Sequence, residues 1–260
     1  MQFLEIFIYS IIQGFTEFLP ISSSAHLYFL EDLFNWTNNG VIYALAAHLG
    51  TLLAVVFYQK NNLYSLIKDS SFTKKNTTYI IYIFIASLPV ILIGGIVSLF
   101  FSDIYKSKLI IIGSASIFGG LLLDFSDRYK QSSKIKKKIS FQMAVITGFF
   151  QILALIPGMS RSGTVITALR LCSLNRNESI KFSLLSGIPI LMVASLYSFY
   201  ELNNTNENIS YAFLIISFLS FFSALFSIKF IFSWTRRFSF RIFSVYRIIF
   251  GILIFIYLLY

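Results

Sequence analysis

The sequence predicts an all-α polytopic membrane protein, and three observations indicate this fold class. Of the 260 residues, 57% are hydrophobic and only 12% are charged. The mean hydropathy of the chain is +0.76. Several uncharged runs approach the ~20 residues that a helix needs to cross a bilayer. Because a water-soluble chain of this composition could not cover its surface with polar groups, most soluble enzyme classes are excluded.

The first half of the chain predicts one broken element followed by three continuous ones. Residues 2–30 are apolar but are interrupted in the middle by a proline and a serine-rich motif, so we expect a re-entrant helical hairpin there. The apolar stretches at about 41–58, 79–101 and 109–125 are each predicted to form a spanning helix.

The second half repeats this order of elements. Residues 141–170 are again apolar and broken in the middle, which predicts a second hairpin, and spanning helices are expected at about 180–200, 211–231 and 242–260. Backbone that leaves the helix at membrane depth is tolerated only where protein buries it or water reaches it. The two breaks therefore indicate a polar cavity.

The basic residues predict how the chain is oriented. Sixteen of the 21 lysines and arginines lie in four connections, which we assign to the cytoplasm. The opposite connections hold only Lys106 and Lys108, so both termini are expected outside. The net charge of +10 forms no basic patch with interleaved stacking aromatics, so no nucleic acid is expected as a partner. The four basic connections are residues 59–76, 125–140, 171–181 and 229–241.

This orientation predicts an inverted-topology repeat within a single integral membrane domain, residues 1–260. Repeat one covers about 1–125, a cytoplasmic linker covers about 126–140 and repeat two covers about 141–260. Each half is a re-entrant hairpin plus three transmembrane helices, and the halves enter the membrane from opposite sides. In such an arrangement a polar site forms near the midplane, where the broken helices meet.

Cysteine and histidine counts limit the kinds of site that the chain can hold. The single Cys172 excludes an internal disulfide and a cysteine-ligated metal site, and two histidines are too few for a His-rich zinc site. Any metal must therefore use oxygen ligands. The first twelve residues lack a basic segment and an A-x-A site, so no cleavable signal peptide is expected.

The first break reads QGFTEFLPISSSAH, residues 13–26, and places several polar groups in an apolar hairpin. Pro20 stops the incoming helix, and Ser22 or Ser23 can cap the outgoing one, which leaves backbone N–H groups and a positive dipole end beside the serines. We therefore expect an anion site, with Ser23 and His26 on one helix face. The alternative is that the serines are plain caps, that Glu17 is a buried structural partner and that His26 only packs.

The second break reads PGMSRSGT, residues 157–164. A proline and a glycine open the turn, and two serines flank Arg161, whose planar fork donates two parallel hydrogen bonds to a phosphate. The alternative is that Arg161 is a buried salt-bridge partner, for example of Glu17. That pairing does not exclude a phosphate site, because the ion pair would then be the empty pocket.

Both motifs carry a family resemblance. QGFTEFLPISSSAH and PGMSRSGTVI closely resemble the two signature motifs of the bacterial undecaprenyl-diphosphatases, the bacitracin-resistance membrane proteins. Further similarity lies in AAHLGTLLAVVFY, KFSLLSGIPILM and FSVYRIIFG. The resemblance implies hydrolysis of undecaprenyl diphosphate to undecaprenyl phosphate and inorganic phosphate, which recycles the lipid carrier for the cell wall. It also implies an inverted-repeat fold in the bacterial cytoplasmic membrane with the site towards the periplasmic side.

The resemblance implies the site residues by position in the motifs. Glu17, Ser23, His26 and Arg161 match the family's functional positions, and Glu17 is expected to hold a divalent cation, Mg²⁺ or Ca²⁺. Two departures are Gln13, which stands where a second carboxylate could be, and Ala25, where glycine is common. The supporting phosphate-binding positions are Gln13, Ser22, Ser160, Ser162 and Gly163.

The leading chemistry has Ser23 attack the terminal phosphorus while His26 or Glu17 takes its proton, and direct attack by an activated water is a close second. A transporter or flippase for the lipid carrier is the alternative function, because it would share the repeats and the midplane site. A phosphatidic-acid-phosphatase-type enzyme is a further rival, but that class needs a histidine after an arginine motif and none follows His48.

Other polar residues are expected to have ordinary roles. His48 is predicted to pack within its helix, and Arg170 and Asp124 are predicted to reach the membrane interface from helix ends. Arg247 is expected either to bind the lipid phosphate or to pair with an acid. The lysine-rich segment 134–138 is interpreted as a topology determinant and a contact for anionic lipids rather than a substrate site. The expected partners are the polyprenyl diphosphate substrate and membrane lipids, and a homodimer is left open as the assembly.

Overall fold

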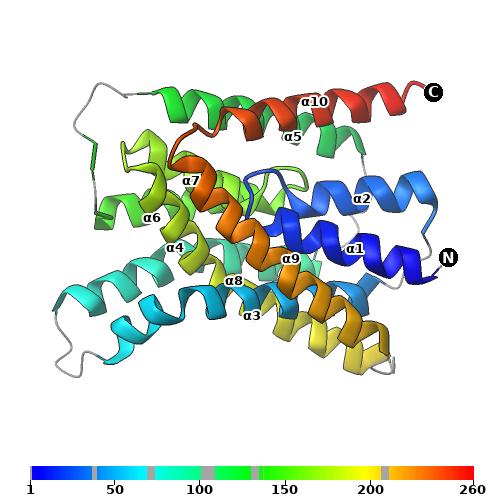
Figure 1. Ribbon diagram of the computed structural model, residues 1–260, viewed down its shortest axis with the longest axis horizontal. Helices are drawn as coiled ribbons and strands as arrows, with labels where there is room; N and C mark the ends of the chain where they lie inside the picture. The colour runs from blue at the N-terminus through cyan, green and yellow to red at the C-terminus, as the bar shows by residue number, and fades with distance from the viewer. Residues whose placement is uncertain are drawn as a thin grey trace.

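The protein is all-helical throughout the part that the computed structural model describes (Figure 1). No strand is present in that part, where the only extended pairing is a bridge between Lys136 and Leu174. The predicted all-α class is therefore confirmed. The described residues are 2–36, 40–68, 74–100, 109–129, 135–136, 138–205 and 211–260.

The first half forms a helical hairpin and three longer helices. The hairpin closes where Pro20 removes a backbone donor and the chain leaves the helix. The long helices follow the predicted apolar stretches but extend past them into polar sequence, because helical hydrogen bonding does not stop at the membrane boundary. The helices are α1 (Gln2–Glu17), α2 (Ser23–Phe34), α3 (Gly40–Lys68), α4 (Lys74–Phe100) and α5 (Leu109–Arg128).

The second half has the same order of elements. Its hairpin has a longer turn than the first, since a short 3₁₀-helix follows α6 before the chain reverses. The elements are α6 (Phe141–Ile152), η1 (Leu153–Leu155), α7 (Arg161–Leu171), α8 (Arg176–Thr205), α9 (Tyr211–Thr235) and α10 (Arg241–Tyr257).

Five of the described helices are long and apolar enough to span a membrane, namely those from α3 to α5 together with α8 and α9. The sixth predicted span, residues 242–260, is shorter than expected because α10 has 17 residues and ends at Tyr257. Its length of about 25 Å falls just short of the ~30 Å hydrocarbon core. The polytopic membrane class is confirmed.

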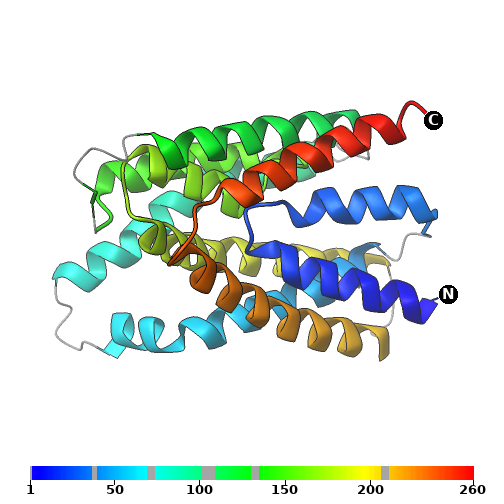
Figure 2. The ribbon, with the colours of Figure 1, turned by 45° about the horizontal axis from the view of Figure 1, so that its top comes forward.

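The first hairpin turns back near the middle of the molecule. Figures 1 and 2 show α1 and α2 running side by side from one end of the molecule, with their turn near the middle of its length. Both chain termini lie at that same end, as the sequence predicts (Figure 1). Which end faces the cytoplasm stays a prediction, and Lys106, Lys108, Lys130, Lys134 and Lys137 lie outside the described residues.

Small residues let the helices approach closely, as is common in membrane bundles. A side chain at Gly14 of α1 would collide with the Ser220 carbonyl of α9, and one at Gly251 of α10 would collide with Gly113 of α5. Serines of α9 add hydrogen bonds to α1, including the 2.6 Å bond from Ser227 Oγ to the Phe15 carbonyl. The hairpin is thereby held against a spanning helix by both packing and polar contacts.

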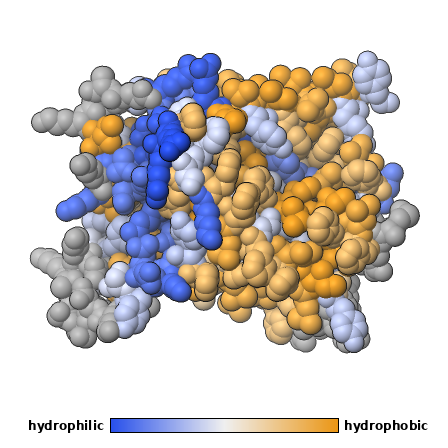
Figure 3. All heavy atoms as spheres, in the orientation of Figure 1, coloured by the Kyte–Doolittle hydropathy of each residue, from blue (hydrophilic) through white to orange (hydrophobic). Residues whose placement is uncertain are grey.

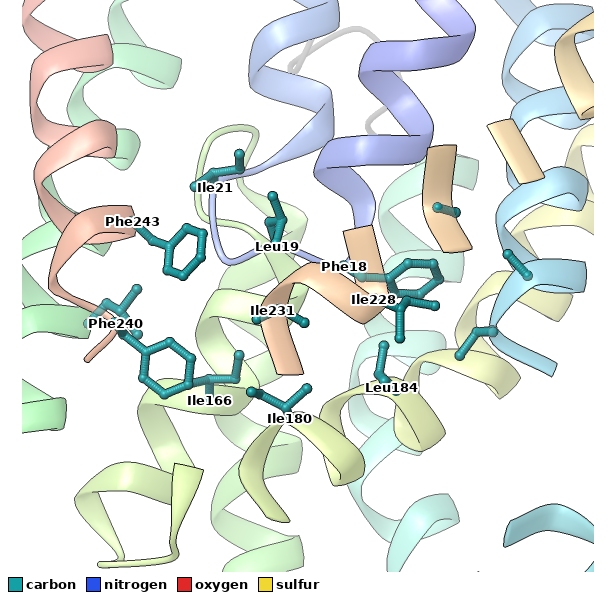
Figure 4. Close-up of a cluster of buried hydrophobic side chains, with 14 of the residues drawn as sticks. Phe18, Leu19, Ile21, Ile166, Ile180, Leu184, Ile228, Ile231, Phe240 and Phe243 are labelled. Carbon is teal, nitrogen blue, oxygen red and sulfur yellow. The ribbon is translucent and has the colours of Figure 1, made fainter. Parts of the chain in front are cut away.

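A cluster of buried apolar side chains encloses the first turn (Figure 4). Phe18 and Leu19, which follow α1 directly, are each 1% exposed. They pack with apolar side chains from α7 to α10, so the turn is fixed by helices from the other half of the chain. The labelled members of this cluster are Phe18, Leu19, Ile21, Ile166, Ile180, Leu184, Ile228, Ile231, Phe240 and Phe243.

The outer surface divides into an apolar region and a polar end. Hydrophobic residues cover the centre and right of the view in Figure 3, whereas hydrophilic residues gather towards the left. Comparison with Figure 1 places the α9–α10 connection, the end of α3 and the start of α4 towards this polar end, opposite the two termini. An apolar surface of this extent is expected for lipid contact.

Candidate functional site

The first turn places a carboxylate beside a hydroxyl. Glu17 is the last residue of α1 and Ser23 is the first of α2. Ser23 Oγ donates a hydrogen bond of 2.8 Å to Glu17 Oε2, and Gln13 Nε2 donates to the same oxygen at 3.0 Å. Gln13 reaches Glu17 because residues four apart share a helix face. The turn therefore assembles three polar side chains that the sequence predicts as site residues.

The start of α2 is unusual. Ser22 occupies the N-cap position with φ 73° and makes no side-chain capping hydrogen bond among the described residues. Its hydroxyl lies 3.3 Å from that of Ser24 instead. The expectation that Ser22 or Ser23 caps this helix through its side chain is therefore wrong, because the Ser22 hydroxyl faces Ser24 and the Ser23 hydroxyl donates to Glu17. The first backbone N–H groups of α2 are left without a side-chain cap, and they carry the positive end of the helix dipole.

The second turn is tied to the first. Ser160 precedes α7 with φ 64°, and its hydroxyl accepts a 3.1 Å hydrogen bond from the Gly163 N–H, which caps that helix. Ser162 lies 3.1 Å from Ser160, oxygen to oxygen, and donates a 2.7 Å hydrogen bond to the Leu19 carbonyl of the first turn. In this structure these serines and Gly163 thus shape the two turns.

Arg161 joins the two motifs. Its Nη2 lies 3.2 Å from Glu17 Oε1, and its Nη1 donates a 2.9 Å hydrogen bond to the Ser183 carbonyl of α8. Both side chains of the ion pair are largely buried, at 12% and 9% exposure. The guanidinium lies against Gly187 of α8, where any side chain would collide with it. The structure therefore holds a cation, a carboxylate and a hydroxyl together at the point where the hairpins meet.

His26 is held away from Ser23. Its Nδ1 lies 2.6 Å from the Ser22 carbonyl oxygen and its Nε2 lies 2.7 Å from the Tyr246 hydroxyl. The ring also stacks on Phe250, with centroids 4.4 Å apart. Both ring nitrogens are thus engaged by groups other than Ser23, although His26 and Ser23 are three residues apart as predicted. Sequence reasoning missed Tyr246, which lies within the similar segment FSVYRIIFG.

Arg247 acts on the backbone of both turns. It is 1% exposed, and its Nη2 donates to the carbonyls of Gly158 at 2.9 Å and Met159 at 3.0 Å. Its Nη1 lies 3.5 Å from the Pro20 carbonyl of the first turn. In the described chain its hydrogen bonds go to carbonyl oxygens, so the expected acid partner is not found. The guanidinium fits only because Gly119 has no side chain.

Two predictions about residues outside the motifs have different outcomes. Arg170 is 6% exposed and donates a 2.9 Å hydrogen bond to Asp127, so the expectation that it reaches the interface is wrong. A buried carboxylate holds it inside the protein. Asp124 pairs with the exposed Arg128 one turn later, and its place at the interface stays a prediction. His48 lies in α3 with Nδ1 buried and unpaired among the described groups.

The oxygen ligands available for a cation are few. The described residues contain no group of three or more histidine, cysteine or acidic side chains able to hold a metal ion. Glu17 supplies the carboxylate, and the Gln13 amide, whose nitrogen contacts Glu17, would have to turn its oxygen towards a cation to bind it. Mg²⁺ commonly uses one or two carboxylates together with substrate phosphates, so this donor set fits a cation that binds with its substrate.

Comparison with known proteins gives one consistent result. The family model of the bacitracin resistance protein BacA matches residues 6–253. The chain is similar to the undecaprenyl-diphosphatase of Pelagibacter ubique, with 37% identity covering 97% of this chain and 96% of that relative. It is also similar to the undecaprenyl-diphosphatases of Alteromonas mediterranea and Idiomarina loihiensis, each at 34% identity. These cover 96% and 98% of this chain, and 97% and 99% of the relatives.

Proposed function

Because this chain belongs to the bacitracin resistance protein BacA family, we propose that it hydrolyses undecaprenyl diphosphate to undecaprenyl phosphate and inorganic phosphate. It is then a membrane-embedded hydrolase acting on a phosphoric anhydride. The reaction returns the lipid carrier to cell-wall synthesis and confers resistance to bacitracin, in keeping with the family's name.

One observation carries the proposal for the site. The carboxylate of Glu17 contacts Ser23 through one oxygen and Arg161 through the other, so the two motifs converge on a single group. Burying each of these side chains costs free energy, because each loses its contact with water. Two motifs with separate structural roles would therefore not be expected to bury them against one another. The convergence supports one active site built from both hairpins.

Arg161 and the start of α2 supply the electrostatic cradle in this proposal. A diphosphate carries several negative charges, which must be neutralised before a nucleophile can approach. The guanidinium of Arg161 offers two parallel donors to a phosphate. The backbone N–H groups at the start of α2, which lack a side-chain cap, are donors of the kind that bind anions at helix N-termini. Substrate phosphate competes with Glu17 for Arg161, which frees the carboxylate to act on Ser23.

Ser23 is the proposed nucleophile and Glu17 is the proposed base. The Ser23 proton passes to Glu17, a bond forms between Ser23 Oγ and the terminal phosphorus, and the anhydride P–O bond breaks to release undecaprenyl phosphate. Glu17 gives this proton to the departing undecaprenyl phosphate and becomes a base again. Water then attacks the phosphoserine while Glu17 takes one of its protons, the bond between phosphorus and Ser23 Oγ breaks, inorganic phosphate leaves and Glu17 returns the proton to Ser23. The 2.8 Å hydrogen bond between Ser23 and Glu17 favours Glu17 over His26 as the base.

His26 keeps a proposed catalytic role that is less direct. Because its ring nitrogens contact the Ser22 carbonyl and the Tyr246 hydroxyl, it must break one of these hydrogen bonds to reach a phosphate. Direct attack by water activated by Glu17 is the second proposed route. It uses the same residues and differs in forming no covalent bond to Ser23.

We also propose that a divalent cation, Mg²⁺ or Ca²⁺, takes part. Glu17 and Gln13 would hold it together with phosphate oxygens, and the cation would neutralise part of the substrate's charge. Chelation by EDTA should abolish phosphate release, and added Mg²⁺ or Ca²⁺ should restore it. Full activity in a chelated, metal-free preparation would reject this cation.

The orientation proposal places the site towards the periplasmic side of the bacterial inner membrane. The basic connections support it, since positive loops face the cytoplasm. In a Cys172→Ser background, a cysteine at the exposed Asn35 should react with an impermeant thiol reagent in intact spheroplasts, whereas one at the exposed Arg237 should not. The reverse labelling pattern would place the site on the cytoplasmic side.

An inverted repeat is also part of the proposal, supported by matching contacts in the two halves. Helix α1 packs on α9, and α6 packs on α4. Each of these contacts has a glycine pressed against a carbonyl, Gly14 against Ser220 and Gly148 against Ile85. The division into repeats at about 1–125 and 141–260 and the assembly as a homodimer stay predictions.

Phosphate release by the purified protein in detergent tests the function. With undecaprenyl diphosphate the protein should release one inorganic phosphate per lipid and leave the monophosphate, detected by chromatography of the lipid. Nothing can be transported in detergent micelles, so a transporter or flippase of the same fold would release none. Absence of release from a folded, cation-supplied preparation would reject the hydrolase.

A further inference from the structure

A second polar feature lies towards the polar end of the bundle, which is opposite the two termini. A cavity of about 470 Å³ opens where α7 ends, α8 begins and α9 ends. Three arginines line it: Arg170, Arg176 and Arg236. Asn175, Asn177 and Thr235 add polar groups to its wall. None of these residues belongs to the site formed by the two hairpin turns.

A single carboxylate serves two of these arginines. Asp127 Oδ1 accepts hydrogen bonds of 2.9 Å from Arg170 Nε and from Arg176 Nε. Its Oδ2 accepts a 2.9 Å bond from Arg176 Nη2 and a 3.0 Å bond from the Phe240 N–H. One negative charge therefore faces two guanidiniums, and Arg236 adds a third positive charge at the rim. The cavity wall keeps an excess of positive charge, which attracts anions.

The arginines differ in how firmly they are held. Arg170 is buried, and besides Asp127 it donates to the Leu174 carbonyl, so it forms a fixed floor. The side chain of Arg176 is 27% exposed, and Arg236 is exposed at the opening. Arg176 also begins α8, whose first turn carries the positive end of a 30-residue helix. Arg176 is also held by its two hydrogen bonds to Asp127, so Arg170 and Arg176 form a fixed wall and the exposed Arg236 is the arginine best placed to meet an entering anion.

Aromatic residues place the opening at the membrane interface. Trp234 and Phe238 lie on either side of Arg236 in the chain, and their rings pack with centroids 4.6 Å apart. The Trp234 Nε1 also donates a 3.1 Å hydrogen bond to the Ser239 carbonyl. Tryptophan is enriched at the depth of lipid headgroups, and Trp234, next to the lining residue Thr235, supports a rim at that depth.

We propose that this cavity binds a phosphate group, carried by the headgroup of an anionic phospholipid or present as inorganic phosphate. Guanidinium forks match phosphate oxygens better than they match a spherical anion. Basic pockets between helices at the cytoplasmic side of membrane proteins bind lipid headgroups in this way. The volume exceeds that of one phosphate and leaves room for a glycerol headgroup.

The test compares two neighbouring arginines of the full-length protein. Arg236→Gln removes a charge that lines the cavity, whereas Arg237→Gln removes a neighbouring exposed charge that is not among the lining residues in the described chain. Binding of phosphatidylglycerol, phosphatidylcholine and inorganic phosphate is measured by native mass spectrometry and calorimetry on delipidated protein in detergent. Phosphate bound at the hairpin site contributes equally to both variants, so the difference between them reports on the cavity.

Phosphatidylglycerol or inorganic phosphate should bind on the order of 10-fold more weakly to Arg236→Gln than to Arg237→Gln, the loss expected for one charge-assisted hydrogen bond. Phosphatidylcholine should bind weakly to both variants, with the same affinity for each. A difference for phosphatidylglycerol alone identifies a lipid site, and a difference for inorganic phosphate identifies a free-phosphate site. Equal affinities of the two variants for both probes would overturn the proposal. Hydrolysis of the lipid diphosphate should be unchanged in Arg236→Gln, so failure here leaves the proposed function intact.

Discussion

The two hairpin turns share an unusual backbone geometry but carry different chemistry. The residue before α2, Ser22, has φ 73° and ψ 100°, and the residue before α7, Ser160, has φ 64° and ψ 115°. A positive φ is uncommon for a residue other than glycine and costs on the order of 1–3 kcal/mol. Each turn therefore needs surrounding contacts that offset this cost.

The contacts differ in a way that separates two tasks. The second turn has a capped helix, because Ser160 accepts from the Gly163 N–H. The first turn has no side-chain cap among its described residues, and it places Ser23 and Glu17 beside the free helix start. The proposed nucleophile and the proposed base thus come from the turn whose helix start has no side-chain cap. The capped second turn carries the positively charged side chain of Arg161.

Ser23→Ala should produce the largest effect, because it removes the proposed nucleophile of the first turn. We expect the rate of phosphate release to fall at least ~1,000-fold, with the protein still folded. Ser24→Ala is the matched control, since Ser24 contacts Ser22 rather than Glu17 and should keep most activity. Rapid-quench experiments with terminally labelled substrate should trap phosphate on Ser23.

A Ser23→Ala enzyme with substantial residual rate, together with no trapped phosphoenzyme in the wild type, would sink the serine nucleophile. Water activated by Glu17 would then be the attacking group. The comparison of the two turns would change accordingly, because the first turn would supply only a base and helix donors.

Arg161→Lys tests the cation of the second turn. Lysine keeps the charge next to Glu17, so the buried pair is not left with an uncompensated carboxylate, but it loses the planar fork. Misplacement of the phosphoryl group should lower kcat/KM on the order of 100-fold. Near-normal kcat/KM with an unchanged melting temperature would show that a diffuse positive field suffices.

Gly119→Ala tests the contact that joins the turns. A side chain at this position would collide with the Arg247 guanidinium, which donates to the carbonyls of Gly158 and Met159. We expect a loss of about 1–3 kcal/mol in stability, the usual range for overpacking, with a partial loss of activity. Gly95→Ala is the control, because a Cβ there meets nothing within 4 Å. Equal melting temperatures for the two variants would argue against Arg247 as the link.

Much of the fold is predictable because the membrane imposes a strong constraint. A helix that crosses hydrocarbon must be long and apolar, so the hydropathy pattern locates the spanning helices and the two breaks. The pattern does not locate helix ends outside the apolar region, and so α3 continues to Lys68 beyond the predicted end at 58. The predicted span at 242–260 is likewise longer than α10.

The site is predictable where its residues are close in sequence or carry a costly charge. Gln13, Glu17 and Ser23 lie within one motif, and Arg161 is an arginine in an apolar region that needs a partner. Tyr246 was missed because its contact with His26 spans 220 residues, and no local pattern encodes the register of two distant helices.

The smallest expected effect compares the two serines of positive φ directly. Ser160→Ala removes the cap of α7, which typically costs about 1 kcal/mol, whereas Ser22→Ala removes no capping bond of α2 and should stay within about 0.5 kcal/mol of wild type. Alanine has the same backbone restriction at both positions, so the strain of positive φ cancels in the comparison. Thermal unfolding in one detergent should therefore show a lower melting temperature for Ser160→Ala alone.

If both variants lost equal stability, capping would not distinguish the turns. The open start of α2 would then lose its support as a phosphate site, because a helix end whose N-cap serine matters as much as that of α7 is already satisfied without a ligand.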